Sequence, residues 1–248
     1  MYIVPFNQLI NPFRYLIFLT ILFSTGFSQA QTNARTWEEE AGTNIRLLPA
    51  YGYVSKTPEM IRADDEFIRR TMERQKFEGS RRKASEEMVS IGFRYLNENN
   101  VKVAMYRFNQ AFLLDSTNSN LYRGFGAVYV YLQLYEKALA QYEKGIQQQA
   151  DNPLLWRDYG RCFLQQAITS GHVQVNDLQY INRAIEYLQK SASFNAKDAE
   201  TWAQLAMSYI LKQDCNKAKE MITAYKQHST IALPEPIVRE LNRNCPLD

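Results

Sequence analysis

Apolar side chains recur through most of this chain at the three-and-four spacing of amphipathic helices. The first clear case predicts a helix from about residue 57 to 76. Its apolar face consists of Met60, Ile61, Phe67, Ile68 and Met72. Thr57 offers an N-cap hydroxyl and Pro58 suits the first helical position, so we expect the helix to begin there.

From residue 85 onward the apolar pattern repeats every 34 residues. Three glycines at that period each precede an aromatic side chain by three positions: Gly92 and Tyr95, Gly126 and Tyr129, Gly160 and Phe163. An alanine follows the first two glycines by twelve positions, with an aromatic four further on: Ala104 and Phe108, Ala138 and Tyr142. Small residues at fixed spacing allow the two helices of a hairpin to approach closely, and the aromatics fill the space beside them.

The third repeat departs from this period. The position for its small residue holds His172, and Ala184, twelve residues later, is the equivalent. The surplus lies near 166–177 and is expected to lengthen the hairpin turn, with Asn176 and Gln179 resembling a capping box for the next helix. A fourth repeat then follows with matching residues: Trp202, Tyr209 and Ala218.

These residues resemble the tetratricopeptide repeat, whose pattern runs Trp-x2-Leu-Gly-x2-Tyr, then Ala-x3-Phe, then Pro. The run from Trp156 to Phe163 is the closest match to its opening. The resemblance covers about residues 85–227, although the repeat ends lack the proline: Ser116, Ala150 and Ala196. It implies an all-α, right-handed superhelical solenoid of antiparallel helix hairpins whose first helices line a concave face.

The segments outside the repeats are expected to cover the ends of that solenoid. Residues 31–56 lack clear periodicity and predict an irregular, extended arm. Apolar side chains would pack it against the helices: Leu47, Leu48, Tyr51 and Tyr53. A capping helix region over 57–84 and a carboxyl-terminal cap over 228–248 would then shield the terminal repeats.

The first 30 residues resemble a signal peptide. Arg14 precedes the uncharged apolar run Leu16–Phe23, and small residues at Ser28 and Ala30 form a signal-peptidase site before Gln31. The run is short for a membrane span, which needs about 20 apolar residues. We therefore expect an exported chain in the periplasm or associated with the cell envelope; an uncleaved anchor is the alternative.

Export would place the three cysteines in an oxidising compartment, where pairing becomes the first question. A chain break at Pro234 and Pro236 would let the tail return, so that Cys245 lies near Cys215. Pairing of these two thiols stays open at this point. Cys162 lies inside a predicted helix and is expected to be a small buried packing residue.

Composition and motifs argue against catalysis and against nucleic acid. The formal charge is +3, and Arg14 is the only charged side chain in the first 30 residues, so the rest carries +2. Such a balance gives no electrostatic reason to expect a nucleic-acid partner. The two histidines, His172 and His228, lie in no nucleophile or metal spacing. We expect a non-enzyme without metal or cofactor.

The resemblance assigns a binding role to the concave face. The family's ligand-facing positions carry over to Glu86, Val89, Phe93, Asn97, Arg123, Ala127, Val130, Tyr131, Arg157, Asp158, Arg161, Leu164, Gln165, Gln204, Met207, Ile210 and Leu211. The planar fork of arginine suits a carboxylate, so convergent arginines would favour an acidic peptide. The alternative is that Arg157 and Arg161 pair with nearby acids such as Asp158 and remain a solvated face.

The function implied is a non-catalytic protein–protein interaction scaffold, or adaptor, of the bacterial cell envelope. The alternative is a membrane-associated structural component, held by an uncleaved amino-terminal segment or by a basic helix over 69–83. The sequence names neither the partner nor the oligomeric state. Cleavage predicts that the mature chain begins at Gln31 when its amino terminus is sequenced, whereas an anchor predicts a mass that still includes residues 1–30.

Overall fold

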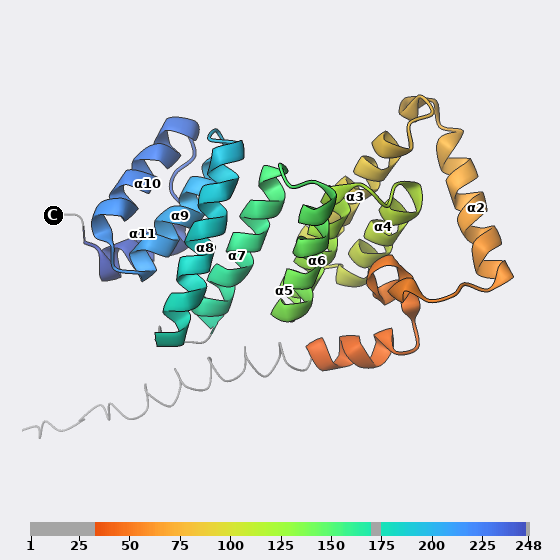
Figure 1. The fold of residues 1–248 in the computed structure, drawn as a ribbon, viewed down its shortest axis with the longest axis horizontal. Helices are drawn as coiled ribbons and strands as arrows, with labels where there is room; N and C mark the ends of the chain where they lie inside the picture. Colours follow the sequence, from red (N-terminus) through yellow and green to blue (C-terminus); the bar gives the residue numbers. More distant parts are fainter. Residues whose placement is uncertain (1–32, 170–174, 247–248) are drawn as a thin grey trace, which may run out of the picture.

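The computed structural model describes residues 33–169 and 175–246, and within those ranges the chain is helical and contains no strand. Eight helices pair into four antiparallel hairpins that stack one beside the next (Figure 1). The hairpins are α3 (Arg81–Asn97) with α4 (Val101–Leu114), α5 (Ser119–Tyr131) with α6 (Tyr135–Gln148), α7 (Pro153–Thr169) with α8 (Val175–Phe194), and α9 (Ala199–Leu211) with α10 (Cys215–His228). The predicted all-α solenoid of helix hairpins is confirmed.

Close helix contacts depend on glycines that leave room for rings. The fully buried ring of Phe108, on α4, lies between Gly92 of α3 and Gly124 of α5. A Cβ atom added to Gly92 would lie 2.4 Å from a carbon of this ring, and one added to Gly124 would lie 2.3 Å from it. Gly126 meets Tyr142 in the same way, at 2.3 Å. The ring of the second helix therefore occupies the space that a side chain of the first helix would need.

The remaining repeat residues line the same core. The alanines are fully buried, and the aromatics are buried except for Tyr95 and Trp202, which are half-buried. This core includes Ala104, Tyr129, Ala138, Trp156, Phe163, Ala184, Tyr209 and Ala218. In the third hairpin the residue that packs against Gly160 is Leu188 rather than an aromatic. A Cβ atom added to Gly160 would lie 2.8 Å from the Cγ atom of Leu188.

Each repeat end is tied to the aromatic residue six positions later. The Nε1 groups of Trp156 and Trp202 donate to the carbonyls of Ala150 and Ala196, both at 2.7 Å. The hydroxyl of Tyr122 donates to the Ser116 carbonyl at 3.3 Å. These carbonyls stand where the tetratricopeptide pattern has proline. The indole and phenol donors thus hold the turn in place of a fixed proline ring.

Consecutive repeats are also joined by buried side-chain hydrogen bonds. Asn118 donates to the hydroxyl of Ser85, and Asn152 donates to that of Ser119, each at 2.9 Å. The two bonds are 34 positions apart and lie at equivalent places. Both bonds therefore join the start of one hairpin to that of the hairpin before it.

The extra residues of the third repeat mainly extend its helices. Helices α7 and α8 contain 17 and 20 residues, against 13 and 14 in α5 and α6. The turn between these two helices, residues 170–174, lies outside the described residues. The predicted capping box does not mark the start of α8, because that helix has already begun at Val175. Apolar side chains continue to pack along the added length, with Ala167 and Ile181 buried. His172 lies outside the described residues.

The amino-terminal arm is not extended, which corrects the prediction for 31–56. Residues 33–41 are helical, followed by two 3-10 segments, η1 (Ile45–Leu47) and η2 (Pro49–Tyr53). Trp37, Ala41 and Leu47 are buried. The amide of Asn109 on α4 donates to the carbonyls of Arg46 and Leu48, at 2.9 and 3.0 Å. Burial of these side chains and bonds to α4 thus shape a segment that has no periodicity of its own.

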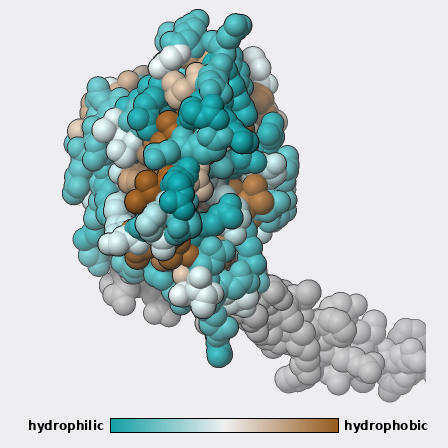
Figure 2. All heavy atoms as spheres, turned by 90° about the vertical axis from the view of Figure 1, so that its right-hand side faces the viewer, coloured by the Kyte–Doolittle hydropathy of each residue, from teal (hydrophilic) through white to brown (hydrophobic). Residues whose placement is uncertain are grey.

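Two helices lie at the ends of the stack. Helix α2 (Pro58–Met72) stands at the amino-terminal end, apart from most of the solenoid (Figure 1), and joins α3 through η3 (Gln75–Phe77). The face at this end is largely hydrophilic with separate apolar patches (Figure 2). At the other end α11 (Glu235–Asn244) packs against α9. Within the described ranges, each helix is too short or too polar to span a bilayer.

The glycine contacts predict the cost of one added methyl group. Gly124→Ala should lower the free energy of unfolding by about 1–2 kcal/mol, because overpacking typically costs about 1–3 kcal/mol and the better helix propensity of alanine offsets part of it. Chemical denaturation measures the change. The surface change Gln148→Ala is the control. The double variant Gly124→Ala with Phe108→Leu should lose less unfolding free energy than the sum of the losses in the two single variants. Full additivity would contradict the contact.

Candidate functional site

A buried carboxylate organises the concave side of the solenoid. Asp158 on α7 is 1% exposed and accepts hydrogen bonds from Arg123 of α5 at 2.9 Å and from Arg157 at 3.3 Å. Arg157 also reaches Asp198, the residue before α9, at 3.1 Å. The chain of ion pairs therefore links the first helices of repeats two, three and four.

The charge state of Asp158 follows from its neighbours. Burial by itself raises the pKa of this carboxyl, but Arg123, Arg161 and Arg157 outweigh burial and hold the pKa below its ordinary value. The ionised carboxylate is thus stabilised by the guanidinium groups around it. Because the Arg123 and Arg157 side chains are only 11% and 16% exposed, these two arginines serve the fold and are not free to meet a ligand.

Two other residues predicted for the concave face also make internal contacts. Phe93 packs edge-on against Phe108 and lies 5.2 Å below the Arg123 guanidinium. Tyr131 is 44% exposed, and its hydroxyl donates to Asn99 at 3.3 Å. The structure therefore does not bring Phe93, Arg123, Tyr131 and Arg157 together with the remaining predicted residues. Their roles as binding residues stay predictions.

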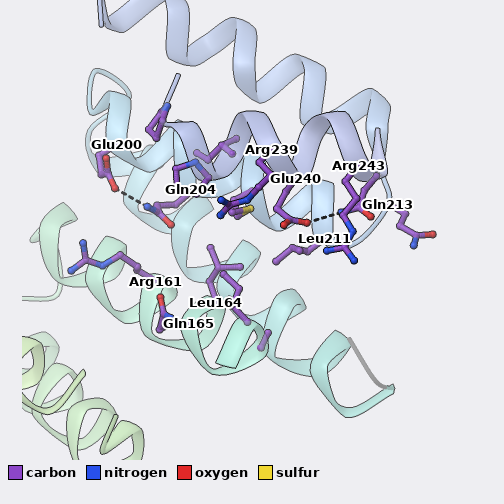
Figure 3. Close-up of a pocket in the computed structure, with 17 residues that line it drawn as sticks. Arg161, Leu164, Gln165, Glu200, Gln204, Leu211, Gln213, Arg239, Glu240 and Arg243 are labelled. Atoms are coloured by element: carbon purple, nitrogen blue, oxygen red, sulfur yellow. Dashed lines mark hydrogen bonds between the residues drawn. The ribbon is translucent and has the colours of Figure 1, made fainter. Parts of the chain in front are cut away.

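Six of the predicted residues meet in a groove of about 890 Å³ at the carboxyl-terminal end. Helices α7 and α9 form its floor and α11 forms a wall, as Figure 3 shows. The predicted residues that line it are Arg161, Leu164, Gln165, Gln204, Met207 and Leu211. Sequence reasoning missed those from α11: Ile237, Arg239, Glu240, Arg243 and Asn244.

The groove combines apolar side chains with arginines that have no partner. Leu164, Met207 and Ile237 are buried along it. In the described part of the chain, Arg161, Arg239 and Arg243 form no ion pair and no side-chain hydrogen bond; the acids of the groove bind amides instead, Glu200 accepting from Gln204 and Glu240 from Asn244. Three guanidinium groups thus remain available for an anionic ligand.

The wall of the groove is held by a disulfide. Cys245, just after α11, is bonded to Cys215 at the start of α10, with their Cα atoms 5.3 Å apart. A helix of ten residues is marginal by itself, and α11 buries only Ile237 and Leu241 among its own side chains. On the chain-entropy model, closing a 30-residue loop stabilises the fold by about 3–4 kcal/mol.

The basic run of residues 69–83 is neither one helix nor a free positive surface. It spans the end of α2, η3 and the start of α3, which corrects the predicted basic helix. Most of its charges face acids of this chain: Arg69 and Arg70 with Glu66, Lys76 with Glu87, Arg82 with Asp115, and Lys83 with Glu78. Arg81 donates to the carbonyls of Leu113 and Leu114. Anionic lipid would have to compete with these partners.

Other reactive groups offer little chemistry. No cluster of three or more potential metal ligands occurs within the described ranges. Burial, with Glu136 nearby, raises the pKa of the Cys162 thiol to about 12, so at neutral pH this sulfur is a protonated packing group. The groove itself presents arginines beside apolar side chains.

Replacing Asp158 tests the ion-pair chain. Asp158→Asn keeps the shape but removes the anion of Arg123 and one of the two anions of Arg157, so the free energy of unfolding should fall by about 3–5 kcal/mol. The exposed Asp151, changed to asparagine, should alter it by less than about 0.5 kcal/mol. Urea denaturation of both variants measures the difference; similar values for both would contradict the role of Asp158.

The same contact predicts a pH dependence. Because the pKa of Asp158 is lower in the folded chain than the ordinary 3.8, its stabilising effect is complete above about pH 4 and is lost as pH falls through the folded pKa. The difference in unfolding free energy between the wild type and Asp158→Asn should therefore shrink below pH 4. A constant difference from pH 7 to pH 3 would contradict the assignment.

Comparisons place this architecture among known folds. No protein-family model and no curated protein matches the chain. Similar solved structures include the following three. YrrB, a TPR protein with an unusual peptide-binding site, is 22% identical over 57% of this chain and 67% of YrrB, with a TM-score of 0.42. The MamA protein is 13% identical over 77% of this chain and 98% of MamA, with a TM-score of 0.43. PilF of Pseudomonas aeruginosa is 14% identical over 67% of this chain and 94% of PilF, with a TM-score of 0.33. These likenesses concern the fold alone.

Proposed function

We propose that this chain is a non-catalytic scaffold of the cell envelope that holds an acidic segment of a protein partner in the groove between α7, α9 and α11. One observation carries the proposal. Arg161, Arg239 and Arg243 line a groove with an apolar floor, yet form no ion pair and no side-chain hydrogen bond among the described residues. Arg123 and Arg157, by contrast, are paired with Asp158.

The chemistry of the groove specifies the kind of segment. Arginine binds carboxylates through paired, charge-assisted hydrogen bonds. Leu164, Met207 and Leu211 would take apolar side chains beside those carboxylates. The expected ligand is therefore an extended peptide in which Asp or Glu alternates with a residue such as leucine.

The disulfide supports the proposed compartment. A structural Cys215–Cys245 bond persists in oxidising surroundings such as the periplasm and is rare in the cytosol. This agrees with the expectation of an exported chain drawn from residues 1–30. The proposal therefore places the scaffold outside the cytosol.

A defined peptide tests the groove directly. Fluorescein-labelled (Asp-Glu-Leu)4, read by fluorescence anisotropy, should bind the oxidised protein, and the affinity should fall as salt is raised. Arg161→Gln combined with Arg239→Gln should weaken binding at least tenfold, because each charged hydrogen bond contributes about 1.5–3 kcal/mol. Arg74→Gln removes an equally exposed charge near the other end and should leave affinity unchanged.

Two controls separate recognition from charge and from folding. A peptide with lysine in place of each acid should not bind, and circular dichroism should show that the variants keep their helices. If the acidic peptide does not bind the wild type, or binds the double variant equally well, the proposed groove is wrong. The test avoids Arg123 and Arg157, since changing either would disturb the fold through Asp158.

A further inference from the structure

We infer that the Cys215–Cys245 disulfide is a redox latch: it holds α11 as a wall of the groove, and its reduction releases this wall and weakens partner binding. The binding half of this inference rests on the proposed function. The structural half rests on how α11 is attached to the solenoid.

Helix α11 lies on the side of the first helices rather than continuing the stack. It packs against α9, whereas the first helices α5, α7 and α9 each pack against the second helix of the preceding hairpin. In Figure 3 it lies across the groove from Arg161, Leu164 and Gln165 of α7. This position makes a terminal helix into one side of the groove.

Apolar burial against α9 and the disulfide hold α11 there. Ile237 and Leu241 are its buried side chains, and the other residues are exposed or half-buried. Among the described residues, the polar side chains of α11 form one hydrogen bond, from Asn244 to Glu240, within the same helix. Because a ten-residue helix is marginal by itself, the covalent link at Cys245 is its principal restraint at the carboxyl end.

Releasing α11 would remove much of the charge of the groove. Two of the three unpaired arginines, Arg239 and Arg243, belong to this helix, and only Arg161 belongs to the repeats. Without its wall, the groove would also lose the apolar contact of Ile237. Reduction is therefore expected to weaken the binding of an acidic segment.

The geometry allows a thiol reductant to act at one sulfur. Cys215 is half-buried, whereas Cys245 is 1% exposed. The thiolate of a dithiol reductant attacks the Cys215 sulfur, the disulfide breaks, and the Cys245 sulfur leaves as a thiolate that takes up a proton. The second thiol of the reductant then resolves the mixed disulfide, so the reductant is oxidised by two electrons and the Cys215 thiolate is released.

Hydrogen exchange read by mass spectrometry tests the release of α11. The wild-type protein is compared oxidised and after treatment with dithiothreitol, with thiol titration to count the two new thiols. Amides of residues 235–244 should exchange at least tenfold faster in the reduced protein, while those of α5 and α6 should not change. Cys215→Ala with Cys245→Ala should match the reduced protein, and Cys162→Ala should match the oxidised one. Equal protection of α11 in both redox states would overturn the latch.

Binding of fluorescein-labelled (Asp-Glu-Leu)4 to the same samples tests the consequence. Reduction should weaken this binding at least fivefold, and reoxidation should restore it. Binding that is unchanged or tighter after reduction would overturn the inference and leave the proposed function standing. If the peptide fails to bind the oxidised protein, the proposed function fails and with it the binding half, whereas the exchange result alone decides the release of α11.

Discussion

The burial of one carboxylate, Asp158, constrains the concave side of this solenoid. A buried charge must be paired, and Asp158 is paired by arginines from its own helix and from α5, with a further link to Asp198 before α9. Three successive hairpins are held in register by this chain of contacts. It also shapes the surface, because Arg123 and Arg157 pair directly with Asp158, whereas Arg161, one turn along α7 from Arg157, forms no ion pair within the described residues.

Along the stack, each hairpin depends mainly on its neighbours. Rings fill the space beside glycines, and buried asparagines join one hairpin to the one before it. Such a stack ends in unsatisfied faces that need covering. The two ends are covered differently. At the amino-terminal end α2 contacts α3 and α4, whereas at the other end α11 lies against α9, a first helix, and so closes one side of the groove.

Much of the fold could be predicted because its signals are local. The 34-residue period, the glycine–aromatic spacing and the helix start at Pro58 all lie within single helices or hairpins. The failures occur where packing between distant segments prevails. Residues 33–41 become helical because Trp37 and Ala41 are buried against the solenoid, and the insert near 166–177 extends α7 and α8 because apolar packing continues along both.

By itself the sequence determined the repeating hairpins, the core residues and the set of arginines from which a binding face could be drawn. Only the tertiary structure decided which of those arginines are free and that Arg239 and Arg243 join Arg161 in a groove. The physical reason is distance along the chain. Helix periodicity is set by residues three or four positions apart in the sequence. The partner of Arg123, however, is 35 residues away, and α11 is joined to α10 by a disulfide whose cysteines are 30 residues apart.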